Sequence, residues 1–283
     1  MENLNTVTEE NLMVFADWLK ANEKARATVE KYVRDVQAFS VWLADATITK
    51  EAAIEYKQYL MDEKGRDATG VNTVIAALNN YFVYAGLDIR LKPLKIQRRT
   101  FLSEEEVLSK AEYKRLLTAA RSMGNIRLYL ALQTICSTGI RVSELRFINV
   151  EAARSGEASI TNKGKTRTVF LPTELKPLLL RYAEAHEIQS GSIFITKNGT
   201  PLNRSNIWTE MKNLYETAGV DPSKIYPHNL RALFARRFYS IDKDLVRLAD
   251  LLGHSRVDTT RRYLMESGEQ HRQRVDALDL IIT

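Results

Sequence analysis

A histidine and an arginine three residues apart are the first side chains whose spacing could serve chemistry. His228 and Arg231 fall on one face of a predicted helix. Three apolar neighbours on that helix indicate that this face is partly buried: Leu230, Leu233 and Phe234. A buried guanidinium needs an anion, either a protein carboxylate or a ligand phosphate. Taken alone, the pair is more typical of a structural salt bridge.

A second candidate group is a histidine in a turn, followed by a tyrosine nine residues later. Apolar periodicity over residues 245–252 predicts an amphipathic helix that Gly253 ends, and His254 comes directly after it. Asp258 is placed to cap a further helix that carries Tyr263. This helix–turn–helix layout has two interpretations, a DNA-reading motif or ordinary packing with Tyr263 at the surface.

The sequence contains no pattern for a metal or a nucleotide. Its four histidines include no H-x-x-x-H pair, and the single cysteine, Cys136, excludes a cysteine cluster for zinc. Neither G-x-x-x-x-G-K-[ST] nor G-x-G-x-x-G occurs. Any catalysis is therefore expected to use side chains alone, without metal or cofactor.

The first ~85 residues predict a small helical bundle. Residues 86–100 then lose periodicity, contain Pro93, and hold five basic side chains against one acidic residue, Asp88. We interpret residues 1–88 as one domain, 89–102 as a basic linker and 103–283 as a second domain. The four helices of the first domain are expected at residues 11–22, 27–43, 50–64 and 69–84.

The second domain is expected to be mainly helical with a small sheet. Ser103 and Glu106 have the spacing of a capping box, so a helix should begin there or shortly after. Residues 158–161 and 168–171 are rich in apolar and β-branched side chains around the turn residues Asn162–Thr166, which predicts a hairpin with a basic tip. Helices are expected at residues 126–138, from Arg141 onward, and at 175–186, 205–218, 228–239, 243–252 and 258–265. The predicted fold class is mainly α with a small β-hairpin, in two domains.

Charge and composition indicate where the protein works more clearly than what it does. The 283 residues include 41 Lys and Arg against 35 Asp and Glu, and residues 1–100 hold 14 of each sign, so the second domain carries the whole excess. This suits a polyanionic partner, although basic surfaces are common in proteins without one. The lone Cys136 and an N-terminus without a signal-peptide layout predict an intracellular, reducing location. No apolar run approaches the ~20 residues of a membrane span, so no membrane partner is expected.

Taken together, these segments resemble the tyrosine recombinase (phage integrase) family. The resemblance lies, in order, in Thr138-Gly-Ile-Arg-Val-Ser-Glu-Leu145, Lys163 on the hairpin, His228-x-x-Arg231, Leu251-Leu-Gly-His254 and Tyr263. It covers about residues 105–265 and is most similar to Xer-type and small mobile-element integrases. Two earlier segments are similar to the helical, SAM-like core-binding domain of the same enzymes: Thr28–Trp42 and Thr69–Phe82.

The resemblance implies site-specific cleavage and rejoining of DNA through a 3′-phosphotyrosine intermediate. Arg141 and Arg231 would grip the nonbridging phosphate oxygens, more strongly in the transition state. Tyr263 would attack phosphorus, and because about one phenol in 10³ is ionised at pH 7, it needs help in losing its proton. By resemblance, His228 is the candidate to assist this, and His254 is the candidate hydrogen-bond partner of the scissile phosphate.

Other basic residues receive supporting roles by the same resemblance. Lys163 would give a proton to the departing 5′ oxygen, with Lys165 as the rival; the family's lysine typically precedes the turn glycine, here Gly164, which favours Lys163. Glu144, one turn after Arg141, would orient that arginine. Phosphate contacts that add affinity without sequence choice are expected from Arg98, Arg99, Lys165 and Arg167.

The implied partner is double-stranded DNA with a specific recombination site, bound by a homotetramer on two sites. Without DNA, a monomer in solution is compatible with this prediction. The C-terminal tail carries the apolar residues Leu278, Leu280, Ile281 and Ile282. It would dock on a neighbouring subunit, and docking on its own domain is the equal alternative. Two other functions stay open, a DNA-binding architectural or regulatory protein that no longer cuts and a type IB topoisomerase-like relaxing enzyme. The expected location is the cytoplasm, on the nucleoid when DNA is bound.

Overall fold

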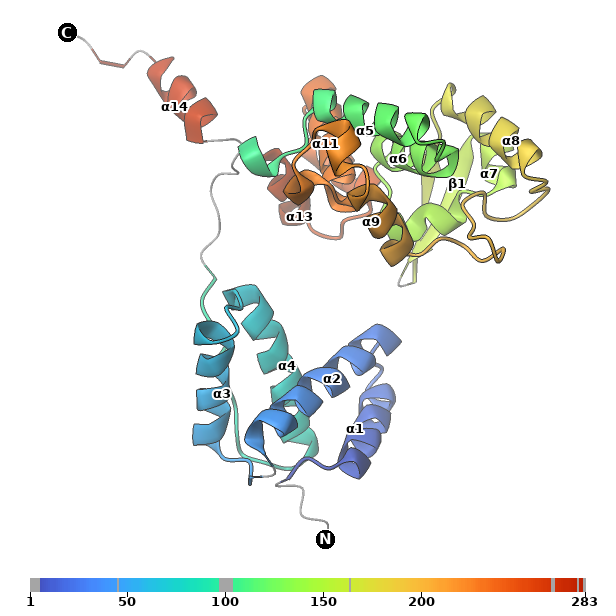
Figure 1. Cartoon of the computed structure of the whole chain (residues 1–283). Coiled ribbons are helices and arrows are strands. Elements are labelled where there is room, and N and C mark those ends of the chain that lie inside the picture. Colours follow the sequence, from blue (N-terminus) through green and yellow to red (C-terminus); the bar gives the residue numbers. More distant parts are fainter. Residues whose placement is uncertain are drawn as a thin grey trace. The chain divides into compact units, whose positions relative to one another are not determined.

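The chain forms two compact units, Met1–Arg98 and Arg99–Thr283, each with its own hydrophobic core. Figure 1 shows the computed structural model, which describes residues 6–44, 46–96, 104–162, 164–265, 268–278 and 280–281. The predicted fold class is confirmed, since helices dominate and one two-stranded antiparallel sheet is present. Within the described ranges, no helix is both long enough and apolar enough to cross a bilayer.

The first unit contains four helices whose ends lie within two residues of those predicted. They are α1 (Glu9–Ala21), α2 (Arg26–Leu43), α3 (Lys50–Asp62) and α4 (Ala68–Tyr84). The side chains of Thr8, Thr49 and Asp67 accept hydrogen bonds from backbone N–H groups in the first turns of α1, α3 and α4, which explains where these helices begin. Large aromatic side chains without exposed surface fill the core, among them Phe15 and Phe39.

The segment after α4 belongs to the first unit, which corrects the predicted linker over residues 89–102. Leu91 is buried in the core, and Asn79 of α4 both donates to its carbonyl (2.9 Å) and accepts from its N–H (2.8 Å). Asn72 makes the same pair of hydrogen bonds with Leu94, at 2.9 and 2.7 Å. The alternation of apolar residues from Leu87 onward signals this packing, but the high content of basic residues obscures it. Residues 97–102 lie outside the described ranges.

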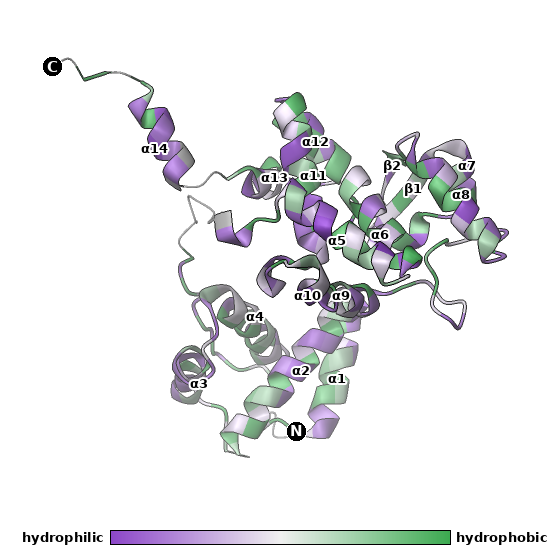
Figure 2. Cartoon of the chain, turned by 45° about the horizontal axis from the view of Figure 1, so that its top comes forward, coloured by the Kyte–Doolittle hydropathy of each residue, from purple (hydrophilic) through white to green (hydrophobic). Residues whose placement is uncertain are grey.

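The second unit is built around helices that pack on α6, with α11 and α5 against it and α7 against α8. Figure 2 shows their mixed apolar and polar faces, whereas α14 is mostly hydrophilic and its described side chains are exposed. Short 3₁₀ turns occupy Glu104–Glu106, Val142–Phe147, Pro222–Lys224 and Arg262–Leu264. The helices are α5 (Lys110–Ser122), α6 (Ile126–Thr138), α7 (Val150–Ser155), α8 (Leu175–Ala185), α9 (Arg204–Lys212), α10 (Tyr215–Ala218), α11 (Pro227–Ile241), α12 (Leu245–Leu252), α13 (Val257–Arg261) and α14 (Gly268–Asp276).

The predicted hairpin is present, with a tighter turn than expected. Strands β1 (Glu157–Asn162) and β2 (Lys165–Phe170) pair so that Asn162 lies opposite Lys165, which leaves a two-residue loop. Gly164 in this loop has φ +76°, a conformation that favours glycine. Lys165 is therefore a strand residue, and Lys163 lies outside the described ranges.

Three other local differences have simple causes. The capping box that begins α5 is formed by Ser109 and Glu112, six residues later than the predicted box. The helix predicted over residues 205–218 is divided into α9 and α10, because α9 ends at a C-cap on Asn213. Helix α7 was not predicted, although the Asn149 N-cap and Gly156 at its end are typical helix boundaries.

The hydrogen bonds to Leu91 predict a local weakness when they are removed. In Asn79→Ala, the buried N–H of Leu91 loses its acceptor, and the free energy that protects this segment should fall by about 1–3 kcal/mol. Amide hydrogen exchange over residues 87–94 measures the loss. The matched control is Asn80→Ala, because among the described residues the Asn80 side chain bonds only to Ala76 of its own helix. Equal protection in both variants would contradict this assignment of the segment.

Candidate active site

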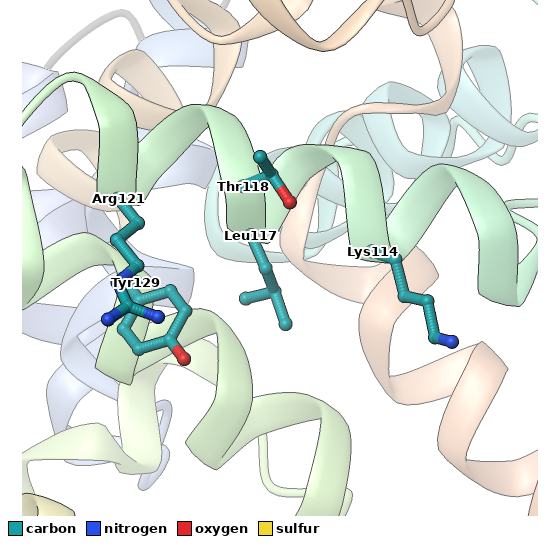
Figure 3. Close-up of a pocket in the computed structure, with 5 residues that line it drawn as sticks. All are labelled: Lys114, Leu117, Thr118, Arg121 and Tyr129. Carbon is teal, nitrogen blue, oxygen red and sulfur yellow. The ribbon is translucent and has the colours of Figure 1, made fainter.

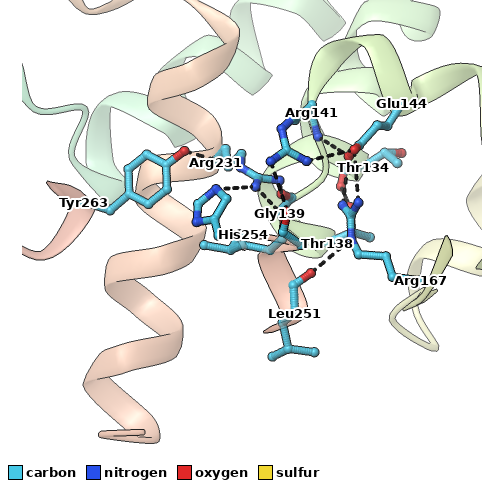
Figure 4. A network of polar contacts seen from close by, with 12 residues as sticks. Thr134, Thr138, Gly139, Arg141, Glu144, Arg167, Arg231, Leu251, His254 and Tyr263 are labelled. Atoms are coloured by element: carbon cyan, nitrogen blue, oxygen red, sulfur yellow. Dashed lines mark hydrogen bonds and ion pairs between the residues drawn. The ribbon is translucent and has the colours of Figure 1, made fainter. Parts of the chain in front are cut away.

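Arg231 lies at the centre of the candidate site and is 1% exposed. Helix α11 turns this arginine inward because the same helix buries Leu230 and Ala235. Its guanidinium donates to the carbonyl of Gly139 (Figure 4) and, at 2.6 Å, to the carbonyl of Leu252. The side chain therefore ties α11 to the ends of α6 and α12.

The described part of the chain places no carboxylate in an ion pair with Arg231. Carbonyl oxygens carry only partial charge, so the positive charge is solvated by dipoles but not neutralised. Burial, together with the like charge of Arg141, lowers the pKa of Arg231 to about 10, which still leaves it protonated at neutral pH. A buried cation in this state favours an anion supplied from outside the protein.

Gly139 makes the approach of Arg231 to α6 possible. It ends α6 with φ +67°, and a Cβ atom built on it would lie 2.4 Å from the ring of Phe234. A side chain at this position would therefore displace Phe234, which lies one turn after Arg231 on α11. Glycine here serves both the backbone conformation and the close contact between the two helices.

Arg141 is held at the site by the carboxylate of Glu144. Its Nη1 donates to Oε1 of Glu144 at 3.0 Å, its backbone N–H donates to Oε2 at 2.8 Å, and Nη2 lies 3.4 Å from the carbonyl of Gly253. Burial alone would raise the pKa of Glu144, but hydrogen bonds from Arg167 and Arg141 outweigh it and lower the pKa to about 2. The carboxylate is thus ionised and fixed.

Arg167 uses its donors inside the protein. Its two terminal nitrogens bond both oxygens of Glu144, at 3.0 and 2.8 Å, and Nε lies 3.3 Å from the carbonyl of Leu251. The contact of Arg167 with DNA stays a prediction. Arg141 and Arg167 therefore share one carboxylate beside Arg231, and the excess positive charge of the three arginines suits a phosphate.

His254 has a defined tautomer, which follows from its two partners. An arginine N–H can only donate, so Nε2 of His254 accepts in its 2.9 Å contact with Arg231. The proton must then be on Nδ1, which lies 2.8 Å from Oγ1 of Thr260, a fully buried hydroxyl. Burial and the charges of Arg231 and Arg141 lower the pKa of His254 to about 4, so it is neutral at pH 7.

The hydroxyl of Tyr263 points toward the buried guanidinium (Figure 4). Tyr263 is 6% exposed, and its oxygen lies 3.4 Å from Nε of Arg231. The ring packs beside His254, with 5.8 Å between ring centroids, in a small core with Leu248 and Leu252. A tyrosine 32 residues from Arg231 along the chain thus reaches the same point in space.

His228 also lies beside the tyrosine, with its ring centroid 5.1 Å from that of Tyr263. Part of His228 is exposed to solvent, unlike its neighbour Arg231. Partial burial and the charges of Arg231 and Arg141 lower its pKa, which favours the neutral, proton-accepting form. The structure therefore brings five of the six predicted catalytic residues together, namely Arg141, His228, Arg231, His254 and Tyr263.

The remaining predicted residues are not all placed at this cluster. Lys163, Arg98 and Arg99 lie outside the described residues. Lys165 is exposed on β2, on the same face as Arg167 by strand alternation. Both lysines stay candidates for the proton donor.

Two residues of the site were missed at the sequence level. Thr260 follows Asp258 in a predicted helical turn, and nothing in a single sequence distinguishes it from the exposed Thr259. Gly139 was read as a helix end, and its second role, giving a carbonyl to Arg231, depends on a contact across 92 residues. Only the folded arrangement reveals these roles.

A shallow hollow in the second unit lies elsewhere. It has a volume of about 360 Å³, and Figure 3 shows its lining by Lys114, Leu117, Thr118, Arg121 and Tyr129. None of these side chains is among the predicted site residues. Among the described residues, no group of three His, Cys, Asp or Glu side chains is arranged to hold a metal ion.

Comparison with known proteins decides the family. The profile described as "Phage integrase family" matches residues 106–270, which is more than half of the chain. The chain belongs to this family. It is a tyrosine recombinase, a DNA strand-transfer enzyme, as the predicted resemblance implied.

Integrase-family relatives match nearly the whole chain. Tyrosine recombinase XerA of Thermococcus kodakarensis is 28% identical over 291 residues, covering 99% of this chain and 98% of that protein. Tyrosine recombinase XerD of Xanthomonas axonopodis pv. citri is 28% identical over 288 residues, covering 89% and 91%.

Solved structures of integrases share the fold. A lambda integrase dimer bound to a COC′ core site has a TM-score of 0.73 and 20% identity, covering 92% of this chain and 78% of that one. The post-cleavage complex of XerH with palindromic difH substrate has a TM-score of 0.73 and 18% identity, covering 97% and 90%.

The environment of His254 predicts that the stability of the folded protein depends on pH. Its imidazole should titrate near pH 4 in the intact protein, against about 6.5 in an unfolded chain. The folded state then binds fewer protons, so the stability from this group is complete above pH ~6.5 and is lost as the pH falls toward 4. NMR titration of the imidazole measures the value, and Arg141→Gln should raise it by removing a nearby cation. A His254 that titrates at about 6.5 in the wild type would contradict this arrangement.

The contact with Thr260 predicts how strongly the His254 ring is held. In Thr260→Val the shape is nearly kept, but Nδ1–H of His254 loses its acceptor, worth about 0.5–1.5 kcal/mol of stability. The tautomer itself should persist, because Arg231 still donates to Nε2. Chemical denaturation measures the loss, and Thr259→Val is the matched control, since Thr259 is exposed. Equal stability of the two variants would remove Thr260 from the site.

Proposed function

We propose that this chain cleaves and rejoins duplex DNA at a specific site, with Tyr263 as the nucleophile. The observation that supports this most directly is the position of the Tyr263 hydroxyl, 3.4 Å from Nε of a buried arginine without a carboxylate partner among the described residues. A phosphodiester placed there would supply the missing anion and present phosphorus to the phenolic oxygen. The same position would be unsuitable for a purely structural arginine.

The reaction conserves the energy of the broken bond. Tyr263 Oη forms a bond to phosphorus, the bond to the 5′ oxygen breaks, and a 3′-phosphotyrosine and a 5′ hydroxyl result. Arg231 and Arg141 bind the nonbridging oxygens, on which charge increases in the transition state. Attack by a 5′ hydroxyl from another strand reverses these steps and restores tyrosine. No external energy source is required.

Proton transfer divides between the two sides of the phosphate. His228 is neutral and lies beside the Tyr263 ring, so we assign it the phenolic proton. Lys163 supplies a proton to the 5′ oxygen, with Lys165 as the alternative, because an arginine does not release its proton near neutral pH.

His254 responds to the arrival of the phosphate. In the free protein its Nε2 carries a lone pair and accepts from Arg231. A phosphate anion between Arg231 and Arg141 offsets the two charges that lower the His254 pKa, which favours protonation at Nε2. His254 can then donate to a nonbridging oxygen while Thr260 keeps the ring oriented.

The proposed partner is double-stranded DNA, and the proposed assembly is a homotetramer on two sites. In support, one structural neighbour is a lambda integrase tetramer bound to a Holliday junction. The helical first unit would form a DNA clamp together with the catalytic unit. The exposed side chains of Leu278, Leu280 and Ile281 provide an apolar surface for a neighbouring subunit.

A covalent-capture experiment tests the nucleophile. Nicked duplexes with randomised sequence are incubated with the intact protein, and DNA that stays attached after denaturation is sequenced. We expect one enriched sequence, with its 3′ phosphate on Tyr263 by mass spectrometry. Tyr263→Phe should abolish the adduct, because a phenyl ring has no nucleophile.

The exposed Tyr215 provides the matched control, and Tyr215→Phe should form the adduct normally. If Tyr263→Phe also formed the adduct normally, the assignment of Tyr263 would be refuted. A second measurement separates the remaining activities: exchange of strands between two differently labelled sites identifies a recombinase, whereas relaxation of supercoiled DNA without exchange identifies a topoisomerase-like enzyme.

A further inference from the structure

Arg167 connects three parts of the site that are distant in sequence. It lies on β2, four residues after Lys163 in the sequence. Its guanidinium reaches Glu144 in the 3₁₀ turn after Arg141, and the carbonyl of Leu251 at the end of α12. The Arg167 side chain therefore connects the hairpin, the 3₁₀ turn after Arg141 and the end of α12 that precedes His254.

The carboxylate of Glu144 is fully engaged by this arrangement. Oε1 accepts from Nη1 of both Arg141 and Arg167, and Oε2 accepts from the backbone N–H of Arg141 and from Nη2 of Arg167. The Glu144 side chain is 2% exposed and that of Arg167 is 17% exposed. Because Arg167 occupies one edge of the carboxylate, Arg141 makes a single side-chain bond to it and its Nη2 remains directed toward Gly253.

The backbone of Gly253 approaches the Arg167 side chain closely. A Cβ atom at this position would lie 2.9 Å from Cδ of Arg167 and 3.0 Å from its Nη1, and the backbone has φ +63°. Arg167 thus lies against the backbone of the residue that directly precedes His254.

We propose that Arg167 is a positioning residue for strand cleavage. It fixes Glu144 so that Arg141 faces the scissile phosphate, and it holds the middle of β2 against the turn that carries His254. This inference rests on the proposed function. It assigns Arg167 no contact with DNA.

The geometry predicts what its removal does. Without Arg167, the Glu144 carboxylate can rotate to form a two-pronged pair with Arg141, which withdraws a donor from the phosphate. A lysine at this position would supply a charge but neither the planar fork nor the bond to Leu251. Outer residues that orient a catalytic group typically contribute about 10- to 100-fold to activity.

The test compares Arg167→Met and Arg167→Lys with wild type in the rate of adduct formation on the captured site. We expect about 10- to 100-fold slower cleavage for Met, a smaller loss for Lys, and DNA affinity within about threefold of wild type for both. Arg181→Ala, at an exposed arginine of α8, is the control and should cleave normally. Wild-type rates in Arg167→Met would overturn the proposal, whereas no adduct with wild type itself would instead refute the proposed function.

A double variant separates positioning from phosphate binding. If Arg167 acts through Glu144, adding Arg167→Met to Glu144→Gln should slow cleavage by less than threefold beyond Glu144→Gln alone. If it acts on the phosphate, the two losses multiply and the proposal fails.

The pH profile provides a readout that a general loss of stability does not move. Glu144 faces Arg141 and Arg167, with Arg231 also near, and its low pKa depends on these cations. In Arg167→Met the acid limb of cleavage should shift to higher pH, and Glu144→Gln should remove that shift. An unshifted acid limb in Arg167→Met would count against the proposal.

Discussion

The site depends on a buried positive charge that the described part of the protein does not neutralise. Desolvating a guanidinium is costly, and the usual compensation is a carboxylate. Here the compensation for Arg231 consists of two carbonyls, an imidazole lone pair and a phenolic oxygen. Such groups stabilise the cation enough for folding but leave its attraction for an anion largely unused. The free protein therefore already holds in place the positive charge that a phosphate would bind.

This constraint explains why the neighbouring arginines are treated differently. Arg141 and Arg167 share Glu144, so the carboxylate lies one step away from Arg231 and does not compete with the phosphate for it. A carboxylate in contact with Arg231 would satisfy the charge and repel the substrate. The arrangement separates orientation, which Glu144 provides, from anion binding, which the guanidiniums of Arg231 and Arg141 provide.

How much could be predicted from the sequence depended on whether the signal was local. Helix periodicity located α1 to α4 within two residues, and the order of the recombinase motifs brought Arg141, Arg231, His254 and Tyr263 to attention. Contacts across the chain left no such signal. Arg167 resembled any basic hairpin residue, and the packing of Leu91 against Asn79 was hidden within a stretch that resembled a charged linker. In each case the partner lies in another element, and one sequence does not reveal which elements meet.

The two histidines beside Tyr263 illustrate how position divides chemical roles between identical side chains. His254 is fixed at both ring nitrogens, by Arg231 and Thr260, so it can orient a ligand but exchanges its proton with difficulty. His228 is exposed and contacts the same ring from the first turn of α11, where water can carry a proton away. Since both have lowered pKa values, both are neutral in the free protein. Solvent access, more than pKa, therefore makes His228 the better acceptor for the phenolic proton and His254 the better phosphate ligand.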